Sequence, residues 1–168
     1  GFTPVFTAAQ YGHVDAIKAL AALGASVNTP ANTGFTPVFT AAMKGHVDAI
    51  KSLAALGVSV NTPANTGFTP VFAAAQYGHV DAIKALAALG ASVNTPANTG
   101  FTPVFTAAQY GQAAAIKLLY KLGADLGCHT SRSGEKWSVL DMAEAADQQA
   151  AVELIKSILR KIESECEC

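Results

Sequence analysis

The sequence has little charge. Asp, Glu, Lys and Arg make up 14% of its 168 residues, against roughly 25% in soluble proteins generally, and the formal net charge is -1. Nucleic acids and acidic membrane surfaces are bound chiefly through an excess of positive charge. This balance therefore argues against either of them as a partner.

The sequence also lacks long apolar runs and a paired set of cysteines. Apolar stretches such as residues 85–91 fall well short of the ~20 residues that span a bilayer, and no basic and apolar segment typical of a secretory signal opens the chain. The three cysteines are odd in number and all lie after residue 127, which argues against a disulfide framework. We therefore expect an intracellular, cytoplasmic protein that does not bind membranes.

What the sequence does contain is a repeat of 33 residues. Residues 1–33 read GFTPVFTAAQYGHVDAIKALAALGASVNTPANT, and nearly the same string restarts at Gly34, Gly67 and Gly100. The fourth copy follows the pattern to Gly111 and then diverges. Self-similarity at a fixed period of this length is typical of solenoid proteins, in which each unit packs only on its neighbours.

A divergent unit comes after the four copies. Within it, residues 137–143 align with residues 101–107, and most of the charge lies after residue 112, with nine of the 12 acidic and seven of the 11 basic residues. A helix pair with one face in water is what the end of a solenoid needs, so we predict a C-terminal capping repeat. The predicted organisation is four repeats over residues 1–33, 34–66, 67–99 and 100–127, then a loop and the fifth, capping repeat over residues 128–168.

Each repeat predicts two short helices. Thr36 is a favourable N-cap and Pro37 suits the first helical position, so a first helix is predicted over residues 37–44, with Gly45 ending it. A second helix is predicted over residues 47–56. Its apolar stripe has helical spacing and consists of Val47, Ile50, Leu53 and Ala54. Helices shorter than roughly 12–15 residues do not persist alone in water, so stacking must hold them.

The repeat unit resembles the ankyrin repeat. Gly34–Ala42 is similar to the family's Gly-x-Thr-Pro-Leu-His-x-Ala-Ala core, Gly45-His46 to its Gly-His pair, and Gly57–Asn61 to its Gly-Ala-Asp-Val-Asn string. The resemblance implies an all-α solenoid of stacked helix-turn-helix units with β-hairpin finger loops. It also implies a non-catalytic protein–protein interaction scaffold, without a cofactor, that binds through its fingers and concave face.

The sequence departs from the family's pattern at two places in the unit. Val38-Phe39 stands where the family has Leu-His, so the family's polar Thr–His contact is lost and we expect an apolar contact in its place. The Asp that usually opens the hairpin is replaced by Ala31, Ala64 and Ala97.

Aromatic residues recur at positions that the resemblance places on the concave surface. Interface cores favour aromatic residues and methionine and are depleted of charge, which supports binding there. The alternative is that a repeated gene simply repeats neutral surface residues. The candidate protein-binding residues are Phe35, Phe68, Phe101, Met43, Lys44, Gln76, Tyr77, Gln109 and Tyr110.

The composition of this surface predicts the kind of partner. We expect an apolar or weakly polar protein, bound with little salt dependence, and a binding energy concentrated on Phe68 and Tyr77. Because neither residue is predicted to lie on the stacking stripe, replacing both by Ala is expected to leave the helices intact.

A structural spacer or a self-associating array without a specific ligand is the competing interpretation. Four apolar residues of the first repeat, Val5, Ala9, Val14 and Ile17, have no preceding repeat in this sequence. We therefore predict an exposed apolar N-terminal end that promotes self-association.

No catalytic or metal-binding motif stands out. His13, His46 and His79 recur every 33 residues, too far apart to share a metal, and the resemblance implies a structural role for them in the turn between the helices. Cys128-His129 and Cys166-Glu167-Cys168 contain four possible zinc ligands. Their spacing fits no familiar zinc finger, and on a helix the last two cysteines would point about 200° apart, so we expect no bound metal.

Overall fold

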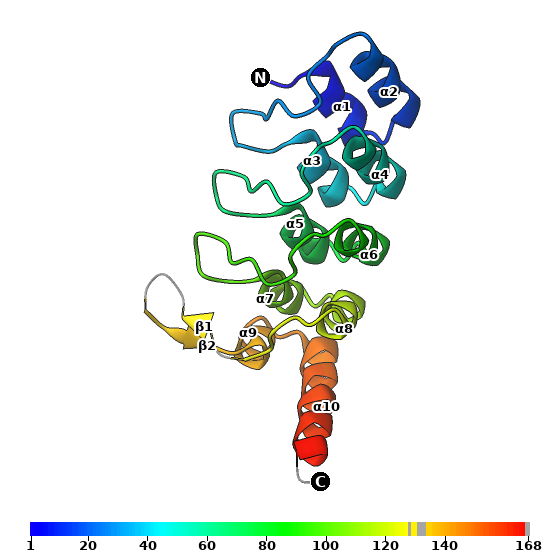
Figure 1. The fold of residues 1–168 in the computed structure, drawn as a ribbon. Coiled ribbons are helices and arrows are strands. Elements are labelled where there is room, and N and C mark those ends of the chain that lie inside the picture. The colour runs from blue at the N-terminus through cyan, green and yellow to red at the C-terminus, as the bar shows by residue number, and fades with distance from the viewer. Residues whose placement is uncertain (128, 131–133, 167–168) are drawn as a thin grey trace.

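The structure is a computed structural model that describes residues 1–127, 129–130 and 134–166, with side chains for 1–127 and 134–164. It is a stack of helix pairs, in which α1, α3, α5, α7 and α9 form one column and α2, α4, α6 and α8 a second (Figure 1). The expected all-α solenoid is confirmed. The elements are α1 Pro4–Gln10, α2 Val14–Ala22, α3 Pro37–Met43, α4 Val47–Ala55, α5 Pro70–Gln76, α6 Val80–Ala88, α7 Pro103–Gln109, α8 Ala113–Lys121, β1 His129–Thr130, β2 Lys136–Trp137, α9 Val139–Ala145 and α10 Gln149–Cys166.

The first helix of each repeat begins and ends as the sequence predicts. In α3, the hydroxyl of Thr36 accepts a hydrogen bond from the backbone N–H of Phe39 at 3.2 Å, and Pro37 occupies the first turn, where no N–H is needed. Gly45 comes after the helix with φ at +74°, a conformation that glycine adopts without steric cost. The helix has only seven residues, so neighbouring helices must stabilise it.

Side chains from the turn between the two helices connect each repeat to the one before it. The Nε2 atom of His46 lies 3.1 Å from the carbonyl oxygen of Gln10, and His79 repeats this contact with Met43 at 3.1 Å. The imidazole of His46 fits because the preceding repeat has a glycine there: a Cβ atom on Gly12 would lie 2.8 Å from His46 Nδ1. The structural role that the resemblance implied is confirmed for these two histidines.

The loops project as fingers on the side of the shorter helices (Figure 1), but in the first four repeats they contain turns instead of strand pairs. The backbone N–H of Ala64 donates to the carbonyl of Phe68 at 2.9 Å, which closes one tight loop. Successive fingers are also linked, because Asn65 Nδ2 donates to the carbonyl of Asn32 at 3.0 Å. Pro63, which lacks an N–H, disfavours a longer ladder.

The core runs the length of the stack, and it corrects one expectation about the first repeat. Val5, Ala9 and Ile17 are fully buried and Val14 is half-buried, although no repeat precedes them. They face their own partner helix and the second repeat, so they do not form an exposed end. The open face of this repeat carries other residues.

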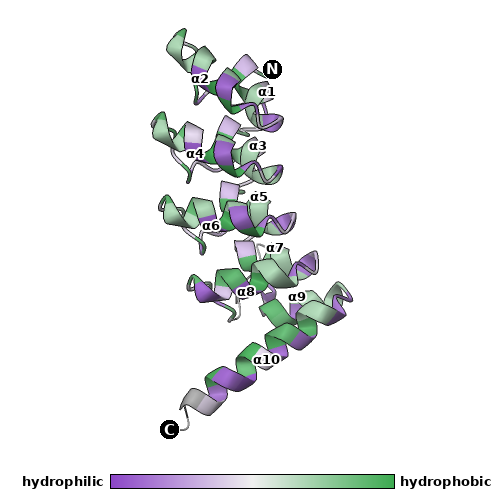
Figure 2. Ribbon diagram, turned by 90° about the vertical axis from the view of Figure 1, so that its right-hand side faces the viewer, coloured by the Kyte–Doolittle hydropathy of each residue, from purple (hydrophilic) through white to green (hydrophobic). Residues whose placement is uncertain are grey.

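The C-terminal unit differs from the repeats in its helices. Ser138 caps α9 and forms a capping box with Asp141, and α10 has 18 residues where α8 has nine. Hydrophilic and hydrophobic residues alternate along α10 as it extends beyond the stack (Figure 2). Lys156 on α10 pairs with Glu144 on α9 at 2.9 Å. Within the described residues, no helix combines the length and apolar character needed to cross a membrane.

Candidate protein-binding surface

The finger phenylalanines are half-buried, and each stacks on a second phenylalanine in the helix that comes after it. The ring centroids are 4.3 Å apart for Phe35 and Phe39 and 4.3 Å for Phe68 and Phe72. The helix residue is the one that replaces the family's histidine, so the expected apolar contact at this position is formed by two stacked rings.

Part of the predicted surface therefore belongs to the packing of the stack. Phe68, Phe35 and Met43 all pack against a small core formed by Phe39, Ala64 and Ala73, which joins the second and third repeats. The expectation that Phe68 stands apart from the packed positions is wrong, because its ring covers this core. The pattern of apolar residues within the helices did not reveal it, since the contact starts from a loop.

Other predicted residues are open to solvent. Tyr77 is 53% exposed and Tyr110 51%, and Lys44 is also exposed. All three occupy the C-cap of a short helix. The side chain of Gln109 is exposed and that of Gln76 half-buried. These residues form the accessible part of the surface.

Two adjoining cavities lie where the third repeat, the fourth repeat and the C-terminal unit meet. One has a volume of about 320 Å³ and the other about 410 Å³, and both are lined by Phe101, Gln109 and Met142. We call the two together the junction groove. Its further lining residues are Phe68, Phe72, Gln76, Thr99, Phe105, Thr106 and Tyr110 on one side and Glu135, Trp137, Ala145 and Ala146 on the other.

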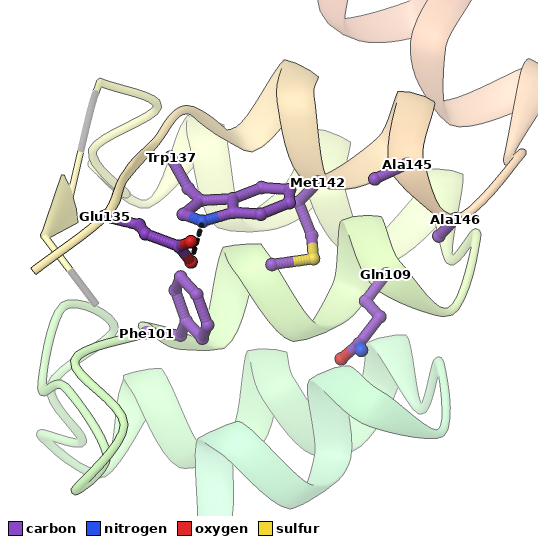
Figure 3. Close-up of a pocket in the computed structure, with 7 residues that line it drawn as sticks. All are labelled: Phe101, Gln109, Glu135, Trp137, Met142, Ala145 and Ala146. Carbon is purple, nitrogen blue, oxygen red and sulfur yellow. Dashed lines mark hydrogen bonds between the residues drawn. The ribbon is translucent and has the colours of Figure 1, made fainter. Parts of the chain in front are cut away.

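The wider part of the junction groove is an aromatic slot. Figure 3 shows the indole of Trp137, the ring of Phe101 and the thioether of Met142 pointing toward one another, with Gln109 at the other end of the cavity. In the repeats, the finger ring stacks on a helix phenylalanine. In the C-terminal unit, Asp141 stands at that position, so the unit supplies no second ring beneath its indole.

The sequence brought forward five of the residues that line the groove and missed the rest. Phe68, Phe101, Gln76, Gln109 and Tyr110 were predicted from the repeat and do line it. The alignment of residues 137–143 with 101–107 already paired Trp137 with Phe101 and Met142 with Thr106, and that signal was sufficient to extend the surface into the C-terminal unit. Phe35, Met43, Lys44 and Tyr77 lie outside the groove.

Charge is sparse along the groove. The carboxylate of Glu135 accepts a hydrogen bond from the indole N–H of Trp137 at 3.5 Å, and the remaining polar groups are amides and hydroxyls. Just outside it, the pKa of Asp141 is lowered because the hydroxyl and the backbone N–H of Ser138 both donate to its carboxylate. A neutral, aromatic groove with amide groups at its edge suits an uncharged segment of protein.

The described residues contain no group of three His, Cys, Asp or Glu side chains able to hold a metal. The zinc possibility raised by the sequence rests on residues outside this description. Cys128 and Cys168 are not described at all, and His129 and Cys166 are described without their side chains.

Comparison with known families agrees with the repeat geometry. A family model described as "Ankyrin repeats (3 copies)" matches residues 1–64 and 56–130. The chain therefore belongs to the ankyrin-repeat family, whose members generally serve as protein-interaction modules. The search of curated proteins finds no matching sequence.

Proposed function

We propose that this protein binds a protein partner through its concave face, and that the junction groove is the centre of the binding site. The observation that carries this proposal is the slot between Trp137, Phe101 and Met142, which joins the aromatic and amide-lined cavity along the fourth repeat. Binding energy in interfaces concentrates where large apolar groups fill pockets from which water is excluded.

The groove supports a particular mode of recognition. An apolar side chain of the partner enters the slot and takes the place of the ring that the C-terminal unit lacks. Gln76 and Gln109 stand at the edge of the groove and can donate to and accept from the backbone of an extended segment. Because Glu135 is the only charged residue that lines it, affinity should depend little on salt.

A library of random peptides displayed on phage tests the proposal. We expect the selected peptides to share an aromatic or aliphatic anchor and to change the emission of Trp137, which is the only tryptophan in the chain. Gln109→Arg places a long charged side chain at the rim shared by both cavities, on an exposed residue that the fold tolerates. It should weaken the selected peptides by about tenfold or more.

The repeat supplies a matched control. Gln10→Arg makes the same change at the equivalent position of the first repeat, far from the groove, and should leave affinity unchanged. The proposal is wrong if the selected peptides ignore Gln109→Arg and instead lose affinity when Asp48 and Lys51 on the outer helix α4 are replaced by Ala. Recognition would then belong to the outer helices.

A further inference from the structure

Identical residues have different exposures in the first repeat and in the later repeats. Leu23 is 85% exposed, whereas its counterparts Leu56 and Leu89 are 40% and 41% exposed. The same contrast holds for Pro4, Thr7, Ala16 and Ala19, which are exposed, against Pro37, Thr40, Ala49 and Ser52, which are buried. Repeats 1 and 3 differ only at residues 7 and 73, so the contrast arises from the neighbour and not from the sequence.

These residues define the leading face of a repeat, the face that packs on the repeat before it. Each later repeat adds polar contacts to this face. His46 meets the carbonyl of Gln10, and Asn65 donates through its side chain to the carbonyl of Asn32. Among the described residues, the counterparts His13 and Asn32 have no such carbonyl to meet, and Asn32 instead accepts from the terminal amine of Gly1 at 2.8 Å.

We propose that the leading face of the first repeat is a docking surface for one more repeat of the same 33-residue sequence, joined directly before Gly1. The interface would continue those already present between the first, second and third repeats. It would bury Ala16 as Ala49 is buried, and it would offer a carbonyl to the ring of His13. Gly1 lies beside the first finger, where a preceding repeat would enter.

A second copy of the chain does not offer the matching surface. The complementary face of the fourth repeat is already covered, because α9 packs on α7 and α10 on α8. Two leading faces brought together would oppose His13 and Asn32 of one copy to the same residues of the other, without the backbone carbonyls that these groups meet inside the stack. A single repeat in isolation has helices too short to persist, so covalent attachment is the source that presents the face.

The test is a chain with one additional copy of residues 1–33 placed before Gly1, compared with the original chain by amide hydrogen exchange. We expect protection in α1 and α2 to rise by about tenfold or more, to the level of α3 and α4, and the extended chain to sediment as a monomer. Unchanged protection in α1 and α2 would overturn the proposal.

Ala16→Glu separates a formed interface from a general effect of length. Ala16 is exposed in the original chain, and an acidic residue in the first turn of a helix is favourable, so the original chain should keep its exchange pattern. In the extended chain, the glutamate would lie where Ala49 is buried in the next repeat, and the gain in protection should vanish. If the original chain instead sediments as a dimer at ~100 µM and Ala16→Glu dissociates it, the occupant is a second copy and the proposal fails. Peptide binding to the junction groove at the other end reports on the proposed function alone.

Discussion

Residues 67–72 and 100–105 have the same sequence, GFTPVF, but they are packed differently. In the third repeat, the rings of Phe68 and Phe72 are 4.3 Å apart and the hydroxyl of Thr69 accepts from the backbone N–H of Phe72. In the fourth repeat, the two rings are 5.3 Å apart and the side chain of Thr102 makes no cap bond.

The two segments have different neighbours on their C-terminal side in the stack. The third repeat packs against another repeat, with Phe101 and Thr106 at the contact positions, whereas the fourth packs against a unit that has Trp137 and Met142 there. Identical local sequence therefore gives a closed surface against a repeat and an open groove against the C-terminal unit. Nearest-neighbour contacts decide the shape of a solenoid surface.

The largest expected effect comes from breaking the closed arrangement at its centre. Phe39 is 2% exposed and lies in the core shared by the second and third repeats. Phe39→Ala should lower the free energy of unfolding by about 3 kcal/mol or more, the usual cost of truncating a buried phenylalanine. Urea denaturation measures it, with Phe2→Ala as the control, since Phe2 is exposed and its loss should change stability by less than about 0.5 kcal/mol.

The two residues chosen from the sequence as centres of binding should separate in a stability measurement. Phe68→Ala removes a stacked, half-buried ring and should cost about 1.5 kcal/mol. Tyr77→Ala alters an exposed ring and should stay within about 0.5 kcal/mol. Equal costs for the two substitutions, measured by thermal or urea unfolding, would contradict the division of the surface into packed and accessible residues.

Removing the cap hydroxyl tests the comparison at a single atom. Thr69→Val abolishes an N-cap hydrogen bond and should cost about 1 kcal/mol. Thr102→Val removes a hydroxyl that is buried without a hydrogen-bond partner in the described part of the chain, so stability should stay the same or rise. If both variants lose the same stability, the fourth repeat is capped like the third.

The smallest effect concerns the dependence of stability on pH in the C-terminal unit. The folded-state pKa of Asp141 lies below its ordinary value of 3.8, so its contribution is present above that value and is lost as the pH falls through the lowered pKa. Asp141→Asn should therefore flatten the loss of stability on acidification below pH ~4. The group is almost fully solvated, so the change should be slight, and urea midpoints across this range would detect it. An unchanged acid dependence would show that the capping box is not formed in solution.

The sequence predicted those features that are decided locally. Thr36, Pro37 and Gly45 determine a helix start and end within one repeat, and the structure confirms them. The stacking of Phe35 on Phe39 was missed because a loop residue and a helix residue meet there. The faces assigned to Val5 and Ile17 were wrong because the period of an apolar stripe shows that a helix has a buried side but not which neighbour covers it. Trp137 and Met142 entered the groove only when three elements were seen together.

The glycine beneath each histidine has a consequence for how such a chain can change in length. Gly12 receives the ring of His46, and Gly45 receives that of His79. Deleting residues 34–66 would bring His79 to Gly12, and the stack would close on a contact it already makes. A deletion of any other size within these repeats would place a residue with a Cβ atom beneath the ring, where no space exists for it. The family of viable lengths is therefore discrete, and recombination between copies in register is the route by which this protein can lengthen or shorten without losing its packing.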